Sequence, residues 1–263
     1  MERGFIIPIG GAEEKANNPK ILQRFAELCG NESADILIIP TASRLKDTGS
    51  SYARIFHEMG VKSARVLHFE NRADGERESM IEALHEADGV FLTGGNQLRL
   101  TTNLGGTTFA KTLRRRNAAG MHVAGTSAGA SYLSAHMIAF GDDGPTPAAN
   151  KVTLTPGLGL INSVIVDQHF RQRDRLGRLL TALAFNPFAT GIGLDEDTAA
   201  FIGPDYTMEV LGSGALTIID PSELEYSSMD EAGPTDPVCM IGVRLHILIE
   251  GATFNIKTKV ARP

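Results

Sequence analysis

The sequence predicts an α/β protein in which helices cover both faces of a mostly parallel β-sheet, giving a three-layer sandwich. Short apolar runs alternate regularly with longer stretches that have the 3.6-residue periodicity of amphipathic helices. The apolar runs are continuous, as in the DILIIP run at residues 35–40, which is typical of parallel strands buried on both faces. Several runs end at glycines, and in such sheets the functional groups gather at the carboxyl ends of the strands.

Each expected element follows from its local pattern. Continuous apolar runs predict strands at residues 5–9, 35–40, 64–69, 89–93, 121–124, 163–167 and 190–194. Helical periodicity predicts helices at residues 19–29, 51–59, 77–87, 107–119 and 128–133. Beyond residue 199, short strands at 208–211, 216–220 and 243–249 are expected to extend the same sheet in the antiparallel direction. No linker, repeat or low-complexity tract interrupts the pattern, so residues 1–263 are predicted to form a single domain.

Composition excludes several classes of protein. The net charge of −6 and the pI of about 5.7 give no reason to expect binding to nucleic acid or to an anionic membrane. Cys29 and Cys239 lie far apart and lack metal-ligand spacing, which is typical of a reduced cytosolic protein with buried thiols. No apolar run has the length of a membrane span, and the first residues lead directly into a strand. We therefore expect a soluble cytoplasmic protein without a metal or cofactor.

A candidate nucleophile lies where one strand passes into one helix. Gly125-Thr126-Ser127-Ala128-Gly129 matches the Gly-x-Ser-x-Gly pattern of a nucleophile elbow. A serine on so tight a turn has a strained backbone and presents its hydroxyl at the tip, and the residues two positions away on either side must be almost free of side chain. A simple tight turn is the alternative, but the apolar strand before the turn and the small-residue helix after it favour the elbow.

A serine hydroxyl needs a base, which is usually a histidine oriented by a carboxylate. Of the seven histidines, His169 alone follows a strand end and stands among polar residues. The only acidic cluster at another strand end is Asp195-Glu196-Asp197, and because successive side chains point in different directions, one of the three should reach His169. The order Ser, His, acid differs from that of α/β-hydrolases, which predicts a different fold with a convergent triad.

Four arginines follow the candidate base in a protein that is acidic overall. On a helix, Arg171, Arg175 and Arg178 would share one face, with Arg173 elsewhere. A solvated helix face is one interpretation, and in that case truncating an arginine would change stability little. Their position directly after His169 favours the other interpretation, in which the guanidinium groups bind carboxylates of a substrate.

Six motifs, spread over almost the whole chain, resemble those of one protein family. They are IGGAEEK (residues 9–15), LTGGNQLRL (92–100), GTSAGA (125–130), VDQHFRQRDRLGRL (166–179), GIGLDEDTA (191–199) and VRLHIL (243–248). The long arginine-rich motif is much more specific than the elbow pentapeptide. The chain is similar to the serine peptidase family that contains the cyanophycinases and the aspartyl dipeptidase called peptidase E.

The resemblance implies a fold similar to class I glutamine amidotransferases and a frequently dimeric protein, here a homodimer. It implies Ser127 as nucleophile, His169 as base and Glu196 as the acid. It implies an oxyanion hole from the backbone N–H groups of Gly94, Gly95 and Ala128. The positions that match the family's substrate pocket are Gln97, Asp167, Gln168, Arg173, Arg175 and Arg178. Glu14 and Asn96 depart from the family pattern, in which Asp is expected or frequent at both positions.

The substrate implied by the resemblance is cyanophycin, a poly-aspartate backbone with arginine on each β-carboxyl group, cleaved to β-Asp-Arg dipeptides. Some acid must then bind the substrate guanidinium, and the sequence does not identify it. Two alternatives stay open: a hydrolase of Asp-X or isoaspartyl dipeptides in the same family, and a binding protein without activity on the same scaffold. The arginine-rich motif favours the polymer.

Overall fold

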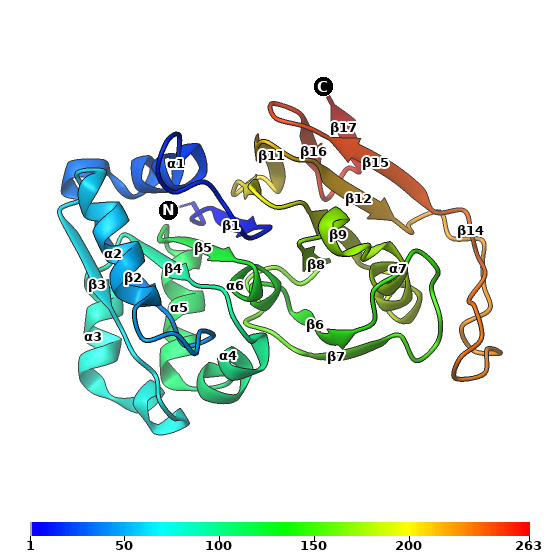
Figure 1. Cartoon of the computed structure of the whole chain (residues 1–263), viewed down its shortest axis with the longest axis horizontal. Helices are drawn as coiled ribbons and strands as arrows, with labels where there is room; N and C mark the ends of the chain where they lie inside the picture. The colour runs from blue at the N-terminus through cyan, green and yellow to red at the C-terminus, as the bar shows by residue number, and fades with distance from the viewer. Residues whose placement is uncertain (1) are drawn as a thin grey trace.

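The computed structural model describes residues 2–263 and contains a large mixed β-sheet with helices on both faces (Figure 1). Across the described residues this sheet has nine strands, in the order β17-β16-β11-β10-β1-β5-β4-β2-β3. The parallel strands are β1 (Ile6–Ile9), β5 (His122–Thr126), β4 (Gly89–Leu92), β2 (Asp35–Ile39) and β3 (Ser63–Val66). The antiparallel strands are β10 (Thr198–Ile202), β11 (Thr207–Gly212), β16 (Thr253–Asn255) and β17 (Val260–Arg262).

Side chains alternate between two cores, one on each face of the parallel strands. In β2, Ile36 packs with α1 (Lys20–Cys29) and α2 (Thr48–Glu58), whereas Leu37 faces the other core. That second core includes buried residues of four helices: α3 (Glu78–Glu86), α4 (Gln97–Leu104), α5 (Thr108–Ala118) and α6 (Ala128–Tyr132). The predicted arrangement, with helices on both faces of a mostly parallel sheet, is thus confirmed for this part of the chain.

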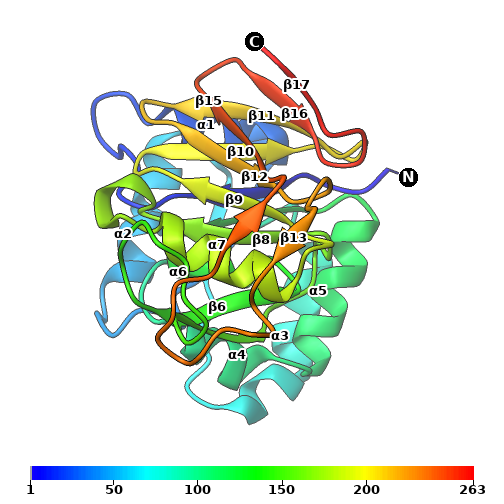
Figure 2. The same cartoon turned by 90° about the vertical axis from the view of Figure 1, so that its right-hand side faces the viewer.

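A second sheet lies beside the first and has the order β15-β12-β9-β8 (Figure 2). Its strands are β8 (Val164–Gln168), β9 (Thr190–Leu194), β12 (Leu216–Asp220) and β15 (Arg244–Leu248). One face packs on α7 (Leu176–Phe185), and the other joins the large core of the first sheet. The expected extension of a single sheet is right for β11 and wrong for β12 and β15, because β12 pairs with β9. An apolar run shows that a strand exists but not which strand it will pair with.

Several small elements complete the described structure. β6 (His136–Gly141) pairs with β7 (Val152–Pro156), and β13 (Tyr226–Ser227) pairs with β14 (Met240–Ile241). Three short 3₁₀ turns are η1 (Asn31–Ser33), η2 (Arg72–Glu76) and η3 (Arg171–Arg173). The sequence analysis missed α4, although the side chain of Asn96 caps its first turn by accepting a bond from the Leu98 N–H. Among residues 2–263, no helix is long and apolar enough to cross a membrane.

Candidate active site

Ser127 occupies a strained turn between β5 and α6. Its φ of 51° and ψ of −112° fall in a region of backbone conformation that residues other than glycine rarely adopt. A Cβ atom added to Gly125 would lie 2.5 Å from the Gly129 carbonyl carbon, and one added to Gly129 would lie 2.3 Å from the Leu92 carbonyl oxygen. Both glycines are therefore required by close backbone approach, as the spacing predicts, and the half-buried Ser127 side chain stands at the tip.

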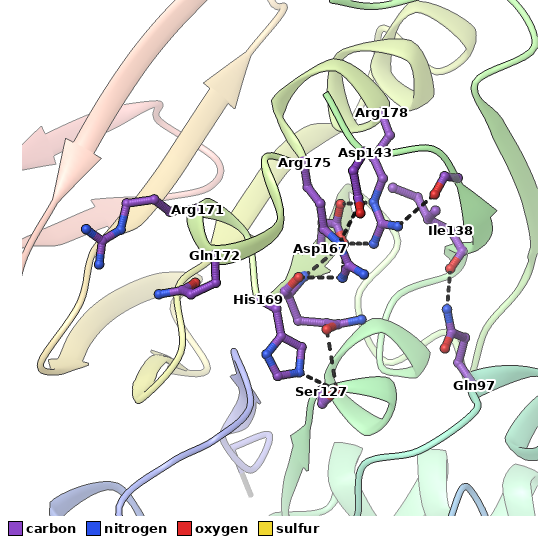
Figure 3. Close-up of polar contacts among 12 residues, drawn as sticks. Gln97, Ser127, Ile138, Asp143, Asp167, His169, Arg171, Gln172, Arg175 and Arg178 are labelled. Atoms are coloured by element: carbon purple, nitrogen blue, oxygen red, sulfur yellow. Dashed lines mark hydrogen bonds and ion pairs between the residues drawn. The ribbon is translucent and has the colours of Figure 1, made fainter. Parts of the chain in front are cut away.

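His169 approaches Ser127 from the second sheet. It follows β8 directly, and its N–H donates to the Gly10 carbonyl at 2.9 Å. Its Nε2 lies 3.0 Å from Ser127 Oγ, and its Nδ1 lies 2.6 Å from Glu196 Oε1 (Figure 3 shows the contact with Ser127). The three side chains thus form a continuous chain of hydrogen bonds, in which Glu196 orients the ring and Nε2 is free to accept the serine proton.

The three acids after β9 have different partners. Asp195 accepts bonds from the backbone N–H groups of Arg171 and Ala215, and Asp197 accepts bonds from the Glu14 N–H and the Ser213 hydroxyl. Glu196 alone contacts His169. The outer two acids therefore hold neighbouring loops in place.

The environment of His169 lowers the pKa of its ring below the ordinary value of 6.5. Burial is the largest cause, because it disfavours the charged form, and the guanidinium groups of Arg173 and Arg175 act in the same direction. The hydrogen bond and negative charge of Glu196 oppose this shift in the pKa. At neutral pH the ring is therefore neutral, which is the state that can accept a proton.

Three residues contact Ser127, His169 or Glu196, or a direct neighbour of one of them, and the sequence analysis gave them no role in the site. A Cβ atom on Gly11 would lie 2.5 Å from Cε1 and Nε2 of the His169 ring, so only glycine leaves room there. Gln172 Oε1 accepts a bond from the Glu196 N–H at 3.2 Å. Glu13 is buried and accepts a bond from the hydroxyl of Thr126, next to Ser127. A glycine pair at a strand end was the signal for Gly11. Glu13 and Gln172 stand in two of the quoted motifs, but nothing in those motifs showed that they would contact the site.

The Gly94-Gly95 turn lies against the serine. A Cβ atom on Gly94 would be 3.3 Å from Ser127 Cβ, and one on Gly95 would be 2.2 Å from the Ala42 carbonyl oxygen. Gly95 also has a φ of +142°, so the turn depends on glycine. Within residues 2–263, the N–H groups of Gly94, Gly95 and Ala128 donate no hydrogen bond to the protein. They are available to an anionic oxygen beside Ser127.

The arginines divide into a buried group and an exposed group, which differs from the predicted common helix face. Arg178 donates to both oxygens of Asp167, with Nε 2.6 Å from Oδ2, and both residues are buried. Arg175 is also buried and donates to the Gln168 carbonyl at 2.6 Å. Arg171 instead lies in η3 and points away from Ser127 toward Asp195 (Figure 3). The alternative of a solvated helix face therefore does not hold for Arg175 and Arg178, which are buried.

The remaining predicted pocket residues are Arg173, Gln168 and Gln97, and their surroundings differ. Arg173 is exposed, and within the described residues its guanidinium has no ion pair. Gln168 Oε1 lies 3.4 Å from Ser127 Oγ. Gln97 Nε2 donates to the carbonyls of Ile138 and Ala139, which leaves its oxygen as an acceptor. A cavity of about 660 Å³ opens beside Ser127 and is lined by Gly94 and Gly95.

Comparisons with known proteins identify the family of this chain. Residues 5–208 match the model of peptidase family S51. The chain belongs to peptidase family S51. A protein of Trichormus variabilis named cyanophycinase is 43% identical over 98% of this chain and 87% of its own length. A second protein of that name, from Geminocystis herdmanii, is 42% identical over 97% of this chain and 95% of its own.

Solved structures show the same fold as this S51 peptidase. A peptidase from an acI-B1 actinobacterium superposes with a TM-score of 0.70 at 20% identity, covering 97% of both chains. A putative peptidase E from Listeria monocytogenes gives a TM-score of 0.54 at 20% identity, covering 80% of this chain and 98% of its own. At this level of identity the likeness concerns the fold.

The buried ion pair leads to a prediction about stability in this S51 peptidase. Arg178→Ala should reduce the free energy of unfolding by about 2–4 kcal/mol, because the buried Asp167 would lose both bonds from Arg178 and, of its ion pairs, keep only the 3.6 Å contact with Arg175. The matched variant Arg171→Ala should change it by about 0–1 kcal/mol, because that side chain is 77% exposed. Urea unfolding followed by circular dichroism measures both values. Equal, small effects would restore the solvated-helix interpretation.

Proposed function

We propose that this protein is a serine peptidase that degrades cyanophycin by cleaving the α-peptide bonds of its poly-aspartate backbone, releasing β-Asp-Arg dipeptides. The observation that carries the proposal is the hydrogen-bonded chain Ser127–His169–Glu196, with Ser127 on a strained turn that has the form of a nucleophile elbow. Family membership and cyanophycinase relatives with 40–43% identity over nearly the whole chain support the substrate.

The chemistry follows from the positions of the three side chains. His169 Nε2 takes the hydroxyl proton while Ser127 Oγ attacks the carbonyl carbon, and Glu196 stabilises the imidazolium that forms. The backbone N–H groups of Gly94, Gly95 and Ala128 stabilise the negative oxygen of the tetrahedral intermediate. His169 then gives the proton to the leaving amine, and water, activated by the same ring, hydrolyses the ester on Ser127.

The substrate residues act in two ways in this proposal. Arg173 forms no ion pair with the residues that the structure describes and lies near His169, so its guanidinium can bind a free carboxylate of the polymer. Gln97 and Gln168 offer amide groups near the reacting centre. The charged groups of Asp167, Arg175 and Arg178 are already paired inside the protein, so they do not bind substrate directly. They instead hold the end of β8, where Arg175 bonds the Gln168 carbonyl, and thereby position Gln168 and His169. This assignment revises the direct binding that the sequence analysis gave to the last three.

We propose that the whole chain forms one catalytic domain related to class I glutamine amidotransferases. Ser127 comes from the first sheet, whereas His169 and Glu196 follow strands of the second, so neither sheet alone holds the site. The homodimer and the cytoplasmic location stay predictions. Of the two thiols that were expected to be buried, Cys29 is buried and Cys239 is exposed.

The substrate is tested directly with insoluble cyanophycin granules. Incubation with the purified protein should clear the suspension and release β-Asp-Arg as the dominant product by mass spectrometry. Ser127→Ala should fold normally and lose activity by about four orders of magnitude or more, because only binding and the oxyanion hole would remain. Intact granules with rapid cleavage of Asp-X dipeptides would establish the dipeptidase alternative, and no cleavage of either would favour a binding protein.

The separate contacts of the three acids predict separate effects. Glu196→Gln should lower kcat by about 10³–10⁴-fold, because it removes the charge that stabilises the imidazolium of His169. The matched variants Asp195→Asn and Asp197→Asn should keep most of the activity, since their carboxylates bind loop groups. Steady-state kinetics of the three purified variants decides the point. A larger loss in Asp195→Asn than in Glu196→Gln would show that the triad is assigned wrongly.

The lowered pKa of His169 predicts the pH dependence. Activity needs the neutral ring, so kcat/KM should be full at neutral pH and fall through an apparent pKa below 6.5 as the ring becomes protonated. Arg173→Ala removes a nearby positive charge, which should raise this pKa and move the acid limb to higher pH. Arg171→Ala, whose side chain points away, should leave the limb in place. A limb that stays fixed or moves lower in Arg173→Ala would contradict the account.

A further inference from the structure

A groove follows the carboxyl ends of the parallel strands away from Ser127. In the first sheet, β5, β4, β2 and β3 are successive neighbours (Figure 1). The cavity beside Ser127 lies over the turns that follow β5, β4 and β2. A second cavity of about 570 Å³ lies over the loops that follow β2 and β3, and we call it the distal cavity. Since neighbouring strands are about 4.8 Å apart, the distal cavity lies roughly 10–15 Å from Ser127.

The two cavities meet at the loop after β2. Ser43, Arg44 and Leu45 line both of them, so a chain that leaves the serine can continue into the distal cavity across this loop. Leu45 is 71% exposed and lines both cavities. A large apolar side chain exposed at this position adds no stability to the fold, but it can pack against an extended ligand.

Charged groups of both signs line the distal cavity without internal partners. Lys46 and Arg99 supply positive charge and Glu70 supplies negative charge, and within residues 2–263 none of these side chains forms an ion pair. Thr41, which is buried and also lines this cavity, has a hydroxyl oxygen without a hydrogen-bond partner in the described structure. Buried polar groups are ordinarily paired, so this hydroxyl is an exception in the wall of the cavity, and the exposed charges around it are the groups that a ligand can reach.

We propose that the distal cavity binds one Asp-Arg unit of the polymer, several units away from the bond that is cleaved. This inference rests on the proposed function. Each such unit carries a guanidinium and a free α-carboxylate, so it presents both signs of charge. Glu70 binds the guanidinium, and Arg99 with Lys46 binds the carboxylate. An extended backbone advances about 3.4 Å per residue, so the bound unit is about three to four residues from Ser127.

The consequence is a preference for long substrates. A substrate of two Asp-Arg units spans the scissile bond but is too short to reach the distal cavity. A long polymer gains the additional contact and binds more tightly. Because Lys46 and Glu70 are exposed and Arg99 is half-buried, this additional affinity should weaken as salt is raised.

The test compares a long and a short substrate in variants that lack charges of the distal cavity and in a control variant that lacks charges elsewhere. The double variant Glu70→Gln/Arg99→Ala should lower kcat/KM for soluble long-chain cyanophycin by about five- to tenfold, mainly by raising KM. Its kcat/KM for a synthetic two-unit peptide should stay within about twofold of the wild-type value. Arg54→Ala/Glu58→Gln is the matched control, because it removes the same kinds of charge from an exposed pair on α2. Lys46→Ala, on an exposed loop, gives a second, independent variant that should show the same preference.

The outcomes separate the inference from the proposed function. Turnover of the two-unit peptide by the wild-type protein tests the function, and the ratio of polymer to peptide activity in the variants tests the distal cavity. An unchanged ratio in both the double variant and Lys46→Ala would overturn the inference alone. Equal losses on both substrates would also overturn it. A wild-type protein that cleaves neither substrate would remove the function and the inference together.

Discussion

The site depends on how closely the two sheets approach at Gly10 and Gly11. A Cβ atom on Gly10 would lie 1.9 Å from the Asp195 carbonyl oxygen, and one on Gly11 would lie 2.5 Å from the ring of His169. The Gly10 N–H donates to the Thr198 carbonyl, and its own carbonyl accepts from the His169 N–H. This glycine pair at the end of β1 therefore joins the strand that precedes His169 to the loop that carries Glu196. Any side chain there would separate the base from Ser127.

Some charged groups of the site stabilise the fold, and others affect the protonation of His169. Asp167 and Arg178 neutralise each other inside the protein, where an unpaired charge would be costly, and Arg175 adds a bond to the backbone of Gln168. Burial together with the remaining positive charge of Arg173 keeps His169 neutral. The same arginine-rich segment therefore supports the base and adds to the lowering of the His169 pKa that burial causes, and in the proposed function it supplies Arg173 for a substrate carboxylate.

Much of this arrangement could be predicted from the sequence, because the signals are local. Continuous apolar runs indicate buried parallel strands, and the spacing of Gly125 and Gly129 around Ser127 reflects a steric requirement of one turn. The partition into two sheets could not be predicted, because strand pairing is not local. The common face of the arginines was wrong for a specific reason: Asp174 has a φ of 48°, which ends η3 before α7 begins and turns Arg171 away from Arg175.

The central claim is that His169 activates Ser127 as a nucleophile, and covalent labelling tests it most directly. A fluorophosphonate should give a single adduct in intact-mass spectra of the wild-type protein, and peptide mapping should place this adduct on Ser127. The labelling rate should fall by about 10³-fold or more in His169→Ala, because the serine proton would then have no acceptor. Labelling of another serine, or an equal rate in His169→Ala, would contradict the account.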